Sequence, residues 1–168
     1  MLGTWIQDYL EAIGYPQTKA TIVFADNMPT VQLGNGSILA VMRNVQAGKR
    51  QAVAVSDDGG ETFGPITLHP DLLTPVCQGS VLFVKDTTIL YAGPRSTTSR
   101  ADMTVLASDD DGNTFNRSLL IWPKSSMYSS MQLLPSGEIV LLFERDGGNT
   151  SVVRFNLSSL KTDDSAAA

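Results

Sequence analysis

A repeated group of three short apolar segments constrains the fold of this chain more than any other feature. Each repeat begins with two apolar segments joined by a polar turn, a pattern typical of β-hairpins. The hairpins start 50 residues apart and occupy residues 31–43, 81–93 and 131–143. A third apolar segment follows each hairpin, at residues 51–55, 103–107 and 151–155. The sequence therefore predicts an all-β fold built from similar antiparallel sheets.

A period near 50 residues in antiparallel strands is typical of β-propeller blades. Blades bury their faces against neighbouring blades, so three of them leave two faces uncovered. The sequence thus predicts about three blades, in a chain that is a fragment or needs a partner. We assign residues 26–160 to the blades and 161–168 to a disordered tail. Residues 1–25 form an N-terminal segment, with a short helix expected over 2–13 and a strand of a preceding blade over 21–24.

Two of the repeats run directly into the same eight-residue turn. The pattern Ser-x-Asp-x-Gly-x-Thr-aromatic, known as an Asp box, occupies residues 56–63 and again 108–115. Side chains of Ser, Asp and Thr can bond the backbone of their own turn, and glycine permits a positive φ. We therefore expect these carboxylates to stabilise the turn rather than to bind calcium or carry out acid–base catalysis.

Composition excludes several classes of function. The net charge of the 168 residues is −5 and no block of Lys or Arg is present, which argues against a nucleic-acid surface. The single cysteine, Cys77, cannot form an internal disulfide. No apolar run approaches the roughly 20 residues of a membrane helix, and the first residues lack the features of a signal peptide. Neither a metal-ligand cluster nor a cofactor loop is apparent, so we predict no metal and no cofactor.

Five segments resemble, in their order, the exo-α-sialidase (neuraminidase) family, whose members are six-bladed Asp-box propellers. The segments read Leu-Ala-Val-Met-Arg-Asn, Pro-Val-Cys-Gln-Gly-Ser, Arg-Ala-Asp-Met-Thr, Trp-Pro followed by Tyr-Ser-Ser-Met, and Leu-Leu-Phe-Glu-Arg, and they begin at residues 39, 75, 100, 122 and 141. The resemblance covers roughly residues 26–158 and corresponds to the C-terminal half of the family's propeller.

The resemblance implies removal of terminal sialic acid from glycoproteins, gangliosides or oligosaccharides, with retention of configuration. Arg43 and Arg100 match two of the three arginines that bind the sialic acid carboxylate, and Tyr128 matches the nucleophile. Guanidinium groups suit a planar carboxylate, while a neutral tyrosine avoids the repulsion that a carboxylate nucleophile would meet. Gln78 is expected near the pocket, and Glu144 matches a residue that orients the third arginine. A lysosomal or extracellular location is implied by the family alone.

The sequence departs from the family pattern at the base that assists the tyrosine. The family has a glutamate where this chain has Asn27, and the adjacent Asp26 is the candidate replacement. A tyrosine needs such a base because its pKa is near 10. The third arginine and the acid/base aspartate have no counterpart in this sequence. A non-catalytic sialoglycan-binding or scaffold propeller, and a truncated product without a stable fold of its own, therefore remain alternatives to an active hydrolase.

Individual residues also have plainer interpretations. Arg43 can form an ion pair at a blade edge, Arg95 competes with Arg100 for the binding role, and Tyr128 can be a packing residue after a Ser-rich loop. Glu144 can pair with the neighbouring Arg145. Cys77 is expected to be a small buried hydrophobic residue, and His69, in a proline-containing turn, receives no role.

Overall fold

The computed structural model describes residues 28–45 and 48–162. Each predicted hairpin and each predicted third strand is present. The elements are β1 (Thr30–Gln32), β2 (Ile38–Met42), β3 (Arg50–Ser56), β4 (Thr67–Leu73), β5 (Ser80–Lys85), β6 (Thr88–Pro94), β7 (Ala101–Ser108), β8 (Arg117–Leu133), β9 (Ile139–Arg145), β10 (Asn149–Phe155), the 3-10 helix η1 (Leu157–Ser159) and β11 (Lys161–Thr162). The helix expected over 2–13 and the strand expected over 21–24 lie outside the described residues.

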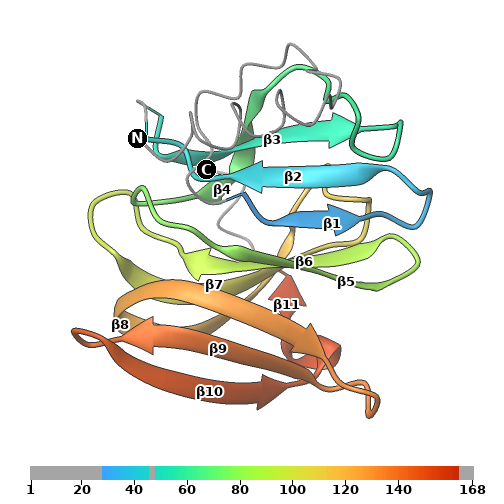
Figure 1. Cartoon of the computed structure of the whole chain (residues 1–168). Helices are drawn as coiled ribbons and strands as arrows, with labels where there is room; N and C mark the ends of the chain where they lie inside the picture. Colours follow the sequence, from blue (N-terminus) through green and yellow to red (C-terminus); the bar gives the residue numbers. More distant parts are fainter. Residues whose placement is uncertain (1–27, 46–47, 163–168) are drawn as a thin grey trace, which may run out of the picture.

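The strands form three antiparallel blades that succeed one another along the chain. The first blade has the order β1-β2-β3-β4, and the second has β5-β6-β7-β8. Strand β8 continues from the second blade into the third, where it pairs with β9, which in turn pairs with β10. Figure 1 shows the blades one below another, with β1–β4 at the top and β8–β10 at the bottom. The predicted all-β architecture of about three propeller blades is confirmed.

Two apolar cores lie between the blades, and β6 contributes to both. Successive side chains of a strand point to opposite faces, and every residue of β6 is buried. Ile89 and Tyr91 pack in the core shared with the first blade. Leu90 and Ala92 pack in the core shared with the third blade. The second blade is therefore covered on both faces, as the central member of a stack requires.

The outermost strand of each of the first two blades, β4 and β8, was not predicted from the sequence. Strand β4 contains Pro70, which cannot donate to a ladder and is tolerated here because β4 lies at the sheet edge. His69 therefore belongs to a strand, and its assignment to a turn was wrong. The segment before Tyr128 is likewise part of the 17-residue strand β8 rather than a Ser-rich loop. Prolines in both segments hid the strand signal.

The end of the described chain also differs from expectation. Lys161 and Thr162, assigned from the sequence to a disordered tail over 161–168, pair with Ser118 and Arg117 of β8. Leu160, just before them, is buried in the core between the second and third blades. Burial of this leucine brings the chain back along β8, which is why the ordered fold extends through residue 162.

Both Asp boxes bond their own backbone as predicted. In the first box, Asp58 Oδ1 accepts bonds from the Ser56 hydroxyl and the Thr62 amide, each at 2.8 Å, and Ser56 Oγ accepts the Gly60 amide at 2.8 Å. Equivalent bonds join Ser108, Asp110, Gly112 and Thr114 in the second box, at 2.7–2.8 Å. The hydrogen bonds from Thr62 and Ser56 lower the pKa of Asp58 from 3.8 to about 2. These carboxylates are occupied by local bonding.

The second Asp box is fastened to the first blade by two side chains of β4. His69 Nδ1 accepts the Asp71 amide at 3.2 Å, so Nε2 carries the proton and donates to the Gly112 carbonyl at 3.0 Å. The carboxylate of Asp71 accepts a hydrogen bond from the Phe115 amide at 2.9 Å. The His69 and Phe115 rings pack edge to face, with their centroids 5.2 Å apart. His69, which received no role from the sequence, thus joins two blades.

Candidate functional site

Two of the predicted site residues are tied to the loop between β4 and β5, because Gln78 belongs to this loop and Arg100 donates to its Val76 carbonyl. Burial raises the pKa of the Cys77 thiol in this loop, the charges of Arg100 and Arg43 oppose that rise, and the charge of Glu144 adds to it. Arg43 directly follows β2, Arg100 directly precedes β7, and Glu144 lies in β9.

Arg100 makes direct contact with the tyrosine predicted as nucleophile. The Arg100 guanidinium carbon lies 5.5 Å from the centroid of the Tyr128 ring, a cation–π distance. Arg100 Nη2 also donates to the Val76 carbonyl at 3.1 Å, and Nη1 approaches the Met127 sulfur at 3.9 Å. In the described part of the chain, no carboxylate forms an ion pair with Arg100. Its guanidinium therefore retains capacity for an anionic ligand.

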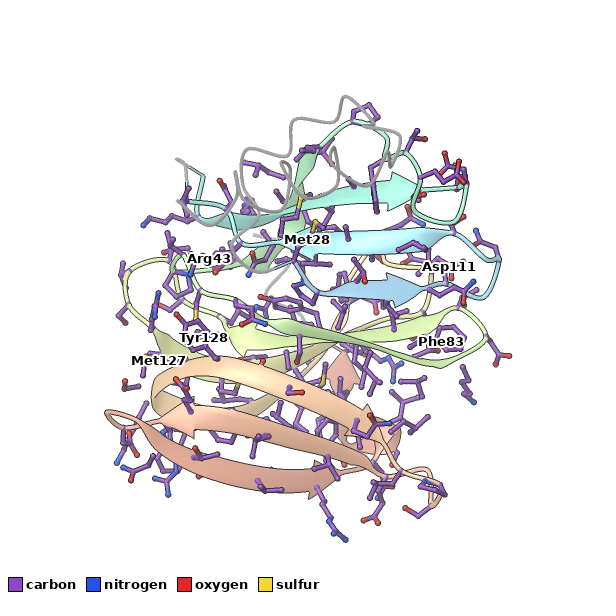
Figure 2. The ribbon with its side chains drawn as sticks, in the orientation of Figure 1. Met28, Arg43, Phe83, Asp111, Met127 and Tyr128 are labelled. Carbon is purple, nitrogen blue, oxygen red and sulfur yellow. The ribbon has the colours of Figure 1, made fainter. Side chains whose placement is uncertain are left out.

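A β-bulge in β8 presents Tyr128. The pairing of β8 with β9 shifts register between Ser126 and Ser129, so Met127 and Tyr128 fall within the irregular stretch. Both flanks are fixed: the Ser126 amide donates to the Arg100 carbonyl at 2.9 Å, and Ser129 Oγ donates to the Ala92 carbonyl at 2.8 Å. Bulges redirect side chains and are common beside active sites. Figure 2 shows Arg43, Met127 and Tyr128 at one end of the blades, with Phe83 and Asp111 at the other.

The loop between β4 and β5 has an unusual conformation next to Arg100. Val76, whose carbonyl bonds Arg100, has a φ of 63°. A β-branched residue in this left-handed region is a genuine outlier, and such conformations cost of order 1–3 kcal/mol. The next residue, Cys77, is completely buried, which agrees with the prediction of a small buried hydrophobic residue. Val76 and Met127 both touch Arg100, and no sequence pattern predicts either contact.

A buried polar pair lies behind the same loop and was also missed. Gln51 of β3 donates from Nε2 to the Cys77 carbonyl at 2.8 Å and to the Tyr91 hydroxyl at 2.7 Å. Gln51 and Tyr91 are 1% and 2% exposed, so both are core residues. The one sequence signal was a polar glutamine at the start of an otherwise apolar strand.

The other predicted site residues are Gln78, Glu144 and Asp26. Gln78 is half-buried in the same loop. Glu144 is half-buried, and it does not pair with Arg145, which binds Asp146 at 2.8 Å and stacks on Trp122 at 4.6 Å. Asp26 and Asn27 lie outside the described residues.

The described residues contain neither a metal-binding cluster nor a membrane-spanning helix. Within residues 28–45 and 48–162, no group of three or more His, Cys, Asp or Glu side chains has a geometry that could hold a metal ion. Over these ranges the structure also contains no helix with the length and apolar character needed to span a membrane.

Comparisons with known proteins agree with this architecture. The model of the BNR repeat-like domain family matches residues 18–141. A sialidase from Micromonospora viridifaciens is 33% identical over 151 residues, which cover 84% of this chain and 23% of that protein. The chain thus spans about a quarter of the length of this relative.

Solved structures show the same similarity. A Hadza microbial sialidase superposes with a TM-score of 0.67 and 26% identity, covering 80% of this chain and 28% of that one. The intramolecular trans-sialidase from Ruminococcus gnavus, solved with oseltamivir carboxylate, has a TM-score of 0.72 and 22% identity, covering 87% of this chain and 35% of that one. The chain therefore belongs to the BNR repeat-like domain family and is a sialidase-type β-propeller in sequence and fold.

Proposed function

We propose that this chain supplies the carboxylate-binding and nucleophilic side chains of a sialidase that removes terminal sialic acid from glycoconjugates. One observation carries the proposal: Arg100 lies against the Tyr128 ring at 5.5 Å and pairs with no carboxylate in the described part of the chain. A guanidinium and a phenol in contact match what a sugar with a carboxylate on its anomeric carbon requires. The similarity to sialidases supports the same substrate class, sialylated glycoproteins, gangliosides and oligosaccharides.

In the proposed mechanism, Arg100 and Arg43 bind the substrate carboxylate and hold the anomeric carbon beside Tyr128. The tyrosine oxygen attacks that carbon and its proton passes to Asp26. The bond to the leaving oxygen breaks, and this oxygen keeps the electron pair and takes a proton from water. Water then releases the sugar from the tyrosine, so the configuration is retained. Gln78 contacts the bound sugar. Glu144 matches the family residue that orients the arginine without a counterpart in this sequence.

A fluorogenic sialoside tests this mechanism. We expect slow cleavage by the unchanged chain, with the α-anomer of sialic acid as the first product seen by NMR. Tyr128→Phe should lower the rate by at least about 100-fold, because the nucleophile is lost while the ring remains. Arg154→Ala, at an exposed arginine of β10, is the control and should keep the rate. Cleavage that survives Tyr128→Phe would rule out the tyrosine mechanism.

A non-catalytic sialoglycan-binding propeller is the second candidate, and one sequence observation favours it. Asn27 stands where the family has its glutamate, and a neutral amide cannot take the proton from Tyr128. This candidate predicts no cleavage by the unchanged chain and retained, Arg100-dependent contact with sialic acid in saturation-transfer NMR. Cleavage that depends on both Tyr128 and Asp26 would exclude it.

A further inference from the structure

Two energetically unfavourable features meet at the loop between β4 and β5, outside the set of residues that would touch the substrate. Val76 holds a φ of 63°, which a β-branched residue rarely adopts. Gln51 buries its side-chain oxygen without a hydrogen-bond partner among the described residues, and a buried polar atom without a partner is unfavourable. Strain of this kind clusters where a fold positions functional groups. The loop is therefore a candidate for a positioning role.

The side chain of Gln51 binds the backbone of this loop at Cys77. Its Nε2 donates to the Cys77 carbonyl at 2.8 Å, and the same carbonyl accepts the Thr74 hydroxyl at 3.2 Å. The Cys77 amide donates back to Thr74 Oγ1 at 3.1 Å. These three bonds fix the peptide groups on either side of Cys77, and Val76 lies between Thr74 and Cys77. The backbone of Val76 is thereby held in its strained conformation.

Tyr91 fixes Gln51 in turn. The Tyr91 hydroxyl accepts a bond from Gln51 Nε2 at 2.7 Å. A Cβ on Gly79 would lie 2.4 Å from the Tyr91 ring and hydroxyl, and one on Gly93 would lie 2.6 Å from the hydroxyl, so both glycines make room for this side chain. Burial raises the pKa of Tyr91 well above its usual value, so the phenol stays protonated. Tyr91 is thus a fixed hydrogen-bonding group rather than a base.

The loop transmits this arrangement to Arg100. The Val76 carbonyl accepts Arg100 Nη2 at 3.1 Å, and a guanidinium is a rigid planar fork, so holding one N–H orients the whole group. Gln51 belongs to the first blade, whereas Tyr91 and Arg100 belong to the second. Gln51 holds the Cys77 carbonyl, and the neighbouring Val76 carbonyl holds Arg100. The orientation of Arg100 therefore depends on how the first and second blades pack together.

We propose that Gln51 and Tyr91 are positioning residues that hold the Val76 carbonyl against Arg100 and so orient its guanidinium for the carboxylate of the ligand. The proposal rests on the proposed function for the identity of that ligand. It assigns a role to two core residues that touch neither the substrate nor the reacting atoms.

The test uses the full chain and replaces Gln51 by Met, which keeps the volume and removes the amide. We expect the melting temperature to change little, because the buried oxygen without a partner is removed while the Tyr91 hydroxyl loses its bond to Gln51. The affinity for N-acetylneuraminic acid should fall about tenfold, the effect of losing one well-placed hydrogen bond. The ¹⁵N signal of the Arg100 guanidinium should shift or broaden. Gln32→Met, at an exposed glutamine of β1, should change none of the three.

Val76→Gly serves as the second variant. Glycine accepts a positive φ without strain, so this protein should fold, melt higher, and show a broadened Arg100 signal with weaker binding. An Arg100 signal unchanged in both variants would overturn the positioning role, whatever the affinities. An unchanged chain that does not bind N-acetylneuraminic acid would instead overturn the proposed function, and the Arg100 signal would still decide the positioning role.

Discussion

At the scale of single residues, close approach explains two glycines that the sequence pattern left unexplained. Gly79 and Gly93 flank the Tyr91 ring, and neither could carry a Cβ without meeting its atoms at 2.4–2.6 Å. Tyr91 is 2% exposed and bonded to Gln51, so the ring cannot move aside. The glycine of the Pro-Val-Cys-Gln-Gly-Ser segment is thus required by packing, quite apart from any contact with a ligand.

Gly79→Ala should destabilise the fold by about 1–3 kcal/mol, the usual cost of an extra carbon in a tightly packed core. Urea denaturation measures the change. Gly64→Ala is the matched control, because its Cβ would meet only the Val55 carbonyl at 3.5 Å, an ordinary contact. Equal stability of the two variants would show that Tyr91 can move and that its position is not fixed.

At the scale of elements, the two Asp boxes have one chemistry and different surroundings. Asp58 is fully exposed and its pKa is lowered to about 2. Burial alone would raise the pKa of Asp110, yet hydrogen bonds from Thr114 and Ser108 outweigh it and lower that pKa as well. The second box also bonds His69 and Asp71 of β4. One turn type thus shapes a blade and, in its second copy, connects two blades.

The first box should make stability depend on pH in the acid range. A folded-state pKa lowered from 3.8 to about 2 contributes stability above the unfolded pKa, and this contribution disappears as the pH falls through about 2. Asp58→Asn should therefore be less stable than the unchanged chain at pH 7, with the difference shrinking between pH 4 and pH 2. Denaturation across this range measures it. Glu61→Gln, an exposed change in the same turn, should leave the curve unchanged. A difference that grows on acidification would contradict this account.

The contact between β4 and the second box should contribute substantially to stability. His69→Ala removes two hydrogen bonds of a buried side chain and its contact with Phe115, so a loss of about 1–3 kcal/mol is expected. Thermal unfolding compares this variant with Thr67→Ala, an exposed position of the same strand. A loss no larger than that of Thr67→Ala would mean that the apolar core alone holds the two blades together.

At the scale of the whole molecule, the sequence predicted the elements that depend on a local residue pattern. The hairpins and the Asp-box turns follow from alternating apolar residues and from side chains that bond their own backbone, and both appear in the structure. Strand β4 and the first part of β8 escaped because Pro70 and Pro123 interrupt the pattern, and their pairing depends on neighbouring strands.

Long-range contacts explain what was missed at the site. Arg100 and Tyr128 were recognisable from the resemblance, and the structure places them in contact. The side-chain hydrogen bonds from Gln51 to Cys77 and Tyr91, and from Arg100 to Val76, join residues 24–40 positions apart in the sequence. No local sequence pattern predicts such pairings. The site thus combines residues recognisable from a motif with supporting residues that only the fold reveals.

The most direct test of the central claim is a titration of the chain with N-acetylneuraminic acid, followed by saturation-transfer NMR. We predict a saturable contact that Arg100→Ala weakens by at least about tenfold, because a charge-assisted bond to the carboxylate is lost. Arg154→Ala, at an exposed arginine of β10, should bind like the unchanged chain. No contact in the unchanged chain, or equal binding by the Arg100→Ala and Arg154→Ala variants, would contradict a carboxylate-binding sialidase site at Arg100 and Tyr128.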